Sequence, residues 1–171
     1  MMTGQAPKED WEDSIEVISD SWYRSVEGPG SDRVQGYGLM VLKRMPKDAR
    51  KEFYERCAIT VWQPPGCSCT FPLYLPRADE TEPDEGEIPK QPALHVVVLQ
   101  ADLPELPNDE AIAVIAHEFA HVVCDHRPGK SSASDGLKEL EERELEADRL
   151  ASSWGFGSEI RSLRSGDAGG G

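Results

Sequence analysis

One stretch of this sequence, residues 113–126, constrains the fold more than any other. Its apolar residues lie on almost every side of a helical projection, which predicts a buried helix. The motif His117-Glu118-Phe119-Ala120-His121 stands inside this stretch. At about 3.6 residues per turn, its two histidines lie one above the other on one face of the helix. Burying these imidazoles and the carboxylate without partners would cost roughly several kcal/mol each, so the helix requires something that satisfies them.

Two histidines four residues apart on a helix can bind a single metal ion. Glu118 lies about 100° around the helix from them, beside such an ion rather than in line with its ligands. It could therefore polarise a metal-bound water instead of binding the metal itself. The alternative interpretation is an accidental motif, with both histidines merely hydrogen-bonded in the core.

A catalytic zinc ion needs a third protein ligand and an open position for water. One pattern places a third histidine ten residues after the first, reached through a glycine that turns the chain. Here those two positions hold Arg127 and Cys124, so this pattern fails. His126 comes one residue too early, and nothing before it bends the helix. The remaining alternative is a carboxylate from the following helix.

That following helix is predicted from about residue 137 to 154, with Gly155 as its stop. Its apolar line comprises Leu137, Leu140, Ala147, Ala151 and Trp154, with a single charged member, Glu144. A carboxylate at a position that should face the core is the predicted third ligand. Asp148, one turn further on, is placed to accept a hydrogen bond from the free N–H of a ligand histidine. Glu141 is the rival ligand, and an ordinary charged helix surface is the alternative to any site.

These residues carry a resemblance to a known group of enzymes. The His-Glu-x-x-His motif, followed one loop later by Glu144-Leu-Glu-Ala-Asp148, resembles the gluzincins, whose second motif is ExxxD or ExxAD. Within that group the chain looks like small soluble bacterial forms, including the ImmA/IrrE-like peptidases and the minimal gluzincins. The resemblance covers about residues 94–151. It implies zinc, metallopeptidase activity, and a strand before the motif helix that lines the substrate cleft, to which residues 94–99 correspond.

The expected function is hydrolysis of peptide bonds in peptides or proteins. Zinc held by His117, His121 and Glu144 would carry a water and lower its pKa toward neutrality, and Glu118 would take the proton as general base. Such enzymes usually add a residue that stabilises the oxyanion. The sequence leaves this residue open among four candidates: Tyr74, His95, His126 and Arg127.

Two rival functions remain open. One is a non-catalytic zinc module with a binding or regulatory role, although a structural site has no use for the base Glu118. The other is a partner-dependent switch, latent until an acidic segment moves. Cys67 and Cys69 could likewise form a second metal site or block the zinc, but the simpler interpretation is unmodified thiols in a loop.

The predicted fold class is α+β, a zincin-like domain with a small sheet packed against the motif helix and the glutamate helix. One domain is expected over residues 9–157, with flexible tails at 1–8 and 158–171 and a mobile acidic segment at 77–92. The predicted elements are helices at 9–26, 47–57 and 108–126, capped in the last case by Asn108, and strands at 58–63, 71–75 and 94–99. Pro72 restricts the second strand to an edge or a terminus, and residues 34–42 are ambiguous.

Charge and hydropathy exclude some classes of binding partner. With 18 basic and 32 acidic residues the formal charge is −14, which argues against nucleic acid or an anionic membrane surface as a general partner. The longest apolar run, residues 111–116, is far shorter than the roughly 20 residues of a membrane span. The first ten residues are polar and the chain has only four cysteines, so a cytoplasmic location is expected.

Overall fold

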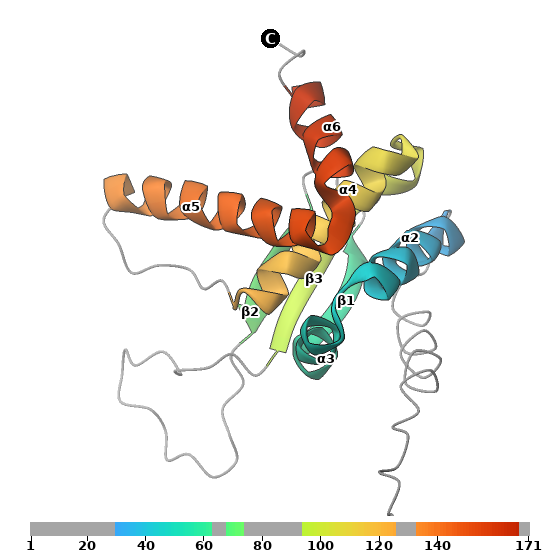
Figure 1. Ribbon diagram of the computed structural model, residues 1–171, viewed down its shortest axis with the longest axis horizontal. Coiled ribbons are helices and arrows are strands. Elements are labelled where there is room, and N and C mark those ends of the chain that lie inside the picture. Colours follow the sequence, from blue (N-terminus) through green and yellow to red (C-terminus); the bar gives the residue numbers. More distant parts are fainter. Residues whose placement is uncertain (1–29, 63–67, 74–93, 126–132, 168–171) are drawn as a thin grey trace, which may run out of the picture.

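The computed structural model describes residues 30–62, 68–73, 94–125 and 133–167 (Figure 1). These residues form a three-stranded sheet and a set of helices, which confirms the predicted α+β class. The helix expected at 9–26, the acidic segment at 77–92 and Cys67 lie outside the described residues. In the described parts, no helix combines the length and apolar character needed to cross a membrane.

The sheet has the strand order β1-β3-β2. Strand β1 (Cys57–Trp62) runs parallel to β3 (Leu94–Gln100), and β2 (Cys69–Leu73) runs antiparallel to it. Alternate residues of β3 are buried, namely His95, Val97 and Leu99, and they form the face that packs on the helices. Pro72 lies in β2, at one end of the strand order in the described residues, which agrees with the edge position predicted for it.

Helix α4 (Asn108–Val123) is the centre of the molecule. It contacts β2 and β3 of the sheet (Figure 1). Its remaining sides contact four helices: α2 (Ser31–Arg44), α3 (Lys47–Arg56), α5 (Ala133–Ala151) and α6 (Gly157–Asp167). Its side chains are therefore buried on most of its circumference, as its apolar sequence predicts. Phe119 is fully buried, with its ring centroid 4.2 Å from that of Phe53 on α3.

Both ends of α4 differ from the prediction. Pro107 occupies the N-cap position, and Asn108 is already helical. The Asn108 side-chain oxygen instead accepts hydrogen bonds from Arg33 Nη2 at 2.7 Å and from the Tyr37 hydroxyl at 2.6 Å, which tie α2 to α4. The helix ends at Val123 rather than near residue 126, because Asp125 adopts a left-handed backbone with φ 52°.

The ambiguous segment 34–42 belongs to α2, in spite of its two glycines. Val34, Tyr37 and Val41 recur at helical spacing and are buried. Tertiary packing of this face outweighs the low helix propensity of glycine. A short 3₁₀ turn, Leu103–Glu105, links β3 to α4.

The C-terminal region departs most from the prediction. Helix α5 (Ala133–Ala151) passes through a π-helical turn (Ser152–Phe156) into α6 (Gly157–Asp167), where a flexible tail was expected from residue 158. Gly155 does break the helix, with φ 94°, but the chain then resumes as a helix. Ile160 is buried and Leu163 packs against the core, so burial of an apolar face holds α6 in place.

The apolar line predicted along α5 is only half buried. Ala147 and Ala151 are fully buried and Trp154 nearly so, whereas Leu137 and Leu140 are 65% and 53% exposed. The first half of α5 extends beyond the body of the protein (Figure 1), so it has no core to face. Core burial along this line begins at Ala147, one turn after position 144.

Candidate metal centre

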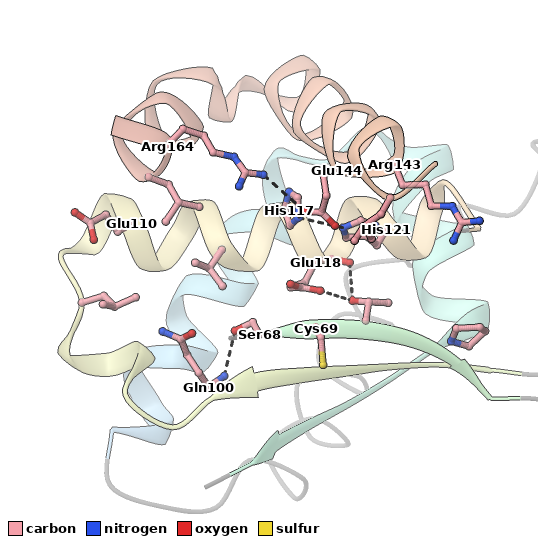
Figure 2. A pocket seen from close by; sticks show the side chains of 16 residues that line it. Ser68, Cys69, Gln100, Glu110, His117, Glu118, His121, Arg143, Glu144 and Arg164 are labelled. Carbon is pink, nitrogen blue, oxygen red and sulfur yellow. Dashed lines mark hydrogen bonds and ion pairs between the residues drawn. The ribbon is translucent and has the colours of Figure 1, made fainter. Parts of the chain in front are cut away.

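Three predicted ligand side chains converge between α4 and α5 (Figure 2). The Nε2 atoms of His117 and His121 lie 3.0 Å apart. Glu144 Oε2 lies 3.0 Å from His117 Nε2, and Glu144 Oε1 lies 3.4 Å from His121 Nε2. Two helices therefore bring two imidazole nitrogens and one carboxylate to a common point.

These distances suit a small tetrahedral ion. Ligand bonds of about 2.0–2.1 Å at tetrahedral angles would set the ligand atoms roughly 3.3 Å apart. The separations of 3.0, 3.0 and 3.4 Å among the atoms of His117, His121 and Glu144 lie close to that value. The nitrogen and oxygen donors are also those that zinc accepts. The residues present therefore fit a zinc ion.

The hydrogen-bond partner of His117 strengthens this fit. Its Nδ1 lies 2.8 Å from Asp148 Oδ1, which is the contact expected for Asp148 from the sequence. If Nδ1–H donates to that carboxylate, Nε2 presents a lone pair toward Glu144 and His121. The carboxylate of Glu144 also presents only lone pairs there. A point where acceptors meet is a site for a cation.

The electrostatics of the cluster agree with that description. With no metal bound and the imidazoles protonated on Nε2, hydrogen bonds from His117 and His121 hold the pKa of Glu144 far below its usual value, against the opposing effect of burial. Burial by itself would lower the pKa of His117, but the hydrogen bond to Glu144 and the neighbouring carboxylates outweigh it and raise that pKa. Glu144 is therefore ionised, and its charge attracts a cation to the point between the histidines.

Glu118 lies beside this cluster and points toward the sheet (Figure 2). It is 5% exposed, and Thr70 of β2 donates a hydrogen bond to its Oε2 at 2.7 Å. Burial raises the pKa of Glu118, while the Thr70 hydroxyl and the two histidines oppose that rise. Glu118 is therefore a buried carboxyl held in one orientation next to the point where the ligand atoms meet.

The cluster opens into a cavity of about 700 Å³. Its walls come from α4, the middle of α5, α6 and β2, with Gln100 at the end of β3. The strand that lines the cavity is thus mainly β2, through Cys69, Thr70 and Pro72, and not the segment 94–99 that the resemblance implies. Segment 94–99 is instead the central strand, and its inward residues pack under the helices.

The structure separates Glu144 from its rival ligand. Glu141 is exposed and does not line the cavity, whereas Glu144 reaches both histidines. Of the four oxyanion candidates, Tyr74, His126 and Arg127 lie outside the described residues. His95 is fully buried, lies 3.2 Å from Asp125, and is not part of the cavity wall.

The three cysteines that the structure describes, Cys57, Cys69 and Cys124, do not join the metal cluster. Cys69 is exposed and lines the cavity, but the group of converging ligand atoms in the described residues consists of His117, His121 and Glu144. Burial and the nearby carboxylate of Glu146 raise the pKa of Cys124 to about 11, so its thiol is protonated at neutral pH.

Three side chains around the site are not identified by the sequence. Thr70 reaches Glu118, Arg143 lines the cavity, and Arg164 lines it while contacting Asp148. Thr70 is 48 residues from Glu118, and Arg164 is 16 residues from Asp148. Each pair lies in two different elements, so the periodicity of a single helix or strand does not predict the contact. The one available signal is that Pro72 predicts an edge strand near Thr70.

Comparison with known families gives one match. Residues 90–154 match the model of the IrrE N-terminal-like domain, a peptidase family. The matched segment contains β3, α4 and α5, and it supports the resemblance to ImmA/IrrE-like metallopeptidases. Neither the curated proteins nor the solved structures include a match to the chain. Thr70 and Arg164 both lie outside the matched segment.

Proposed function

We propose that this chain, with its IrrE N-terminal-like segment at residues 90–154, is a zinc-dependent peptidase that acts on peptides or proteins. The observation that carries the proposal is the convergence of His117, His121 and Glu144 beside the buried carboxyl of Glu118. A cavity of about 700 Å³ opens onto these groups and offers room for a peptide segment. A cytoplasmic location remains a prediction of the sequence.

When held by the two histidines and Glu144, zinc would supply Lewis-acid activation of the scissile carbonyl and of the attacking water. Glu118 is the general base in this proposal, and it later passes the proton to the leaving amine. Its Oε2 accepts the Thr70 hydrogen bond, so we assign the proton to Oε1. The buried setting of Glu118 favours a carboxyl that can both take and release a proton.

Two further residues hold these groups in place. Asp148 accepts the Nδ1–H of His117 and so fixes the imidazole with Nε2 toward the ligand point. Thr70 fixes the carboxylate of Glu118 from the sheet side. Preorganised groups of this kind are what catalysis by positioning requires.

The test combines metal analysis with a peptide-cleavage assay. We expect the purified chain to bind one zinc ion and to cleave members of a diverse peptide library. Glu118→Gln should retain zinc and lose cleavage, because the amide can still accept the Thr70 hydrogen bond but cannot take a proton. Glu142→Gln, at an exposed acid of α5, is the matched control and should leave both properties unchanged.

Two outcomes would contradict the proposal. Undiminished cleavage by Glu118→Gln would remove Glu118 as the base. Full zinc occupancy without any cleavage by the unmodified chain would favour the rival function, a non-catalytic zinc module.

A further inference from the structure

We propose that Arg164 of α6 is a positioning residue of the metal centre, acting on His117 through Asp148. The inference rests on the proposed function in one respect, namely that His117 is a metal ligand. Arg164 lies outside the segment that matches the peptidase family, so the family match does not point to it. The inference adds a helix, α6, to the parts of the chain that build the site.

The contacts form a chain of three side chains. Arg164 Nε lies 3.0 Å from Asp148 Oδ2, and Arg164 Nη2 lies 3.2 Å from Asp148 Oδ1. Asp148 Oδ1 in turn lies 2.8 Å from His117 Nδ1. The guanidinium thus donates to both carboxylate oxygens, which is the two-point geometry that fixes a carboxylate plane.

These two hydrogen bonds from Arg164 to Asp148 have a specific consequence for His117. A carboxylate held at one point can rotate about its terminal bond, whereas one held at two points cannot. With Arg164 in place, Oδ1 of Asp148 stays directed at Nδ1 of His117. The imidazole then keeps one tautomer, with Nε2 free to bind a metal.

The fold provides a reason for Arg164 to be in this position. Gly155, with φ 94°, redirects the chain so that α6 packs back against α4 and α5. Arg44 of α2 secures the turn: it donates to the Gly155 carbonyl at 3.0 Å and to Glu159 at 2.9 Å, and its guanidinium lies 4.3 Å from the Phe156 ring centroid. The turn is thus fixed at the start of the helix that carries Arg164.

Charge and geometry act in opposite directions on the metal. Arg164 Nη2 also lies 3.8 Å from Glu144 Oε2, so its positive charge weakens the attraction of the site for a cation. Removing the charge would therefore mask the loss of positioning. Arg164→Lys keeps the positive charge but loses the planar pair of donors that binds both oxygens of Asp148. This variant therefore tests the positioning role separately from the charge.

The experiment measures zinc affinity of the full chain by competition with a chromophoric chelator. We expect Arg164→Lys to bind zinc about 3- to 10-fold more weakly, less than the roughly 10- to 100-fold effect of losing a direct partner of a ligand histidine. Arg161→Lys, at an exposed arginine of the same helix, should leave the affinity unchanged. Thermal unfolding of each variant checks that the fold is retained.

A double variant tests whether Arg164 acts on His117 through Asp148. In an Asp148→Ala background, Arg164→Lys should have no further effect on zinc affinity, because the link to His117 is already broken. Equal effects in both backgrounds, or unchanged affinity in the single variant, would overturn the proposal. The visible spectrum of the cobalt-substituted protein should change in the same variants.

A metal-free measurement separates this inference from the proposed function. In the metal-free chain, at a pH high enough for the His117 ring to be neutral, the ¹⁵N resonances of that ring report which nitrogen carries the proton. Arg164→Lys should increase the minor tautomer relative to the unmodified chain, and Arg161→Lys should not. If the chain binds no metal, the proposed function fails, but the ring signals still decide whether Arg164 positions His117. Identical signals in Arg164→Lys would refute the positioning role.

Discussion

Removal of the Glu144 carboxylate offers the sharpest test of the metal centre. Glu144→Ala takes away one of three ligand side chains while leaving both histidines on α4. The carboxylate contacts His117 at 3.0 Å and His121 at 3.4 Å, so no other described acid replaces it at that point. We therefore expect a large loss of zinc affinity with the fold retained.

The magnitude follows from the number of ligands. Structural zinc sites with four ligands bind with about 10–16 kcal/mol, or roughly 3 kcal/mol per ligand. A loss of about 3 kcal/mol corresponds to roughly 100-fold weaker binding. At a zinc concentration 100 times the dissociation constant of the unmodified chain, binding stabilises the fold by about 2.7 kcal/mol, whereas the variant would gain only about 0.4 kcal/mol.

Two assays measure this difference, namely chelator competition for affinity and thermal unfolding with and without zinc for stabilisation. Glu141→Ala is the matched control, because it removes an exposed acid from the same helix three residues away. It should bind zinc normally and show the full thermal gain. Unchanged zinc affinity in Glu144→Ala, or reduced zinc affinity in Glu141→Ala, would refute the assignment of Glu144 as the third ligand.

Three further predictions follow from the described contacts. Thr70→Val should slow peptide cleavage by about 10-fold or more without changing zinc affinity. The hydrogen bond that it removes orients Glu118, and hydrogen bonds to charged groups contribute about 1.5–3 kcal/mol. Thr70→Ser keeps the hydroxyl and should retain cleavage. Phe119→Ala should lower the free energy of unfolding in urea by about 3–5 kcal/mol, whereas Leu137→Ala, 65% exposed, should change it by less than about 0.5 kcal/mol. Gly155→Ala should cost about 1–2 kcal/mol by the same measurement, because an added Cβ has no neighbour closer than 3.9 Å and the cost is that of a left-handed backbone; an unchanged midpoint would contradict this reasoning.

The site could be predicted from the sequence where local periodicity determines it. His117 and His121 are one turn apart on a helix, and Glu144 is a charge on an apolar line. The structure brings these three together, together with Asp148 one turn beyond. The relation within each helix comes from its periodicity. The need for a third metal ligand related the two helices, and the resemblance to a known family agreed with that relation.

Contacts between distant elements could not be predicted in this way. Thr70 and Arg164 reach the site only because β2 lies beside β3 and α6 packs back on α4. The periodic line also failed at Leu137 and Leu140, since periodicity indicates which face is apolar but not whether a neighbour covers it. Gly155 was identified as a helix stop, but a left-handed glycine can equally redirect a chain between two helices.

The position of β2 at the end of the strand order has a consequence for motion. Among the described residues β2 pairs with β3 alone, so we expect it to open at a lower free energy than β3, which pairs on both sides. Amide hydrogens of β2 should therefore exchange with solvent sooner than those of β3. Each such opening carries the Thr70 hydroxyl away from Glu118. The carboxyl of Glu118 therefore keeps its orientation only while β2 stays paired with β3.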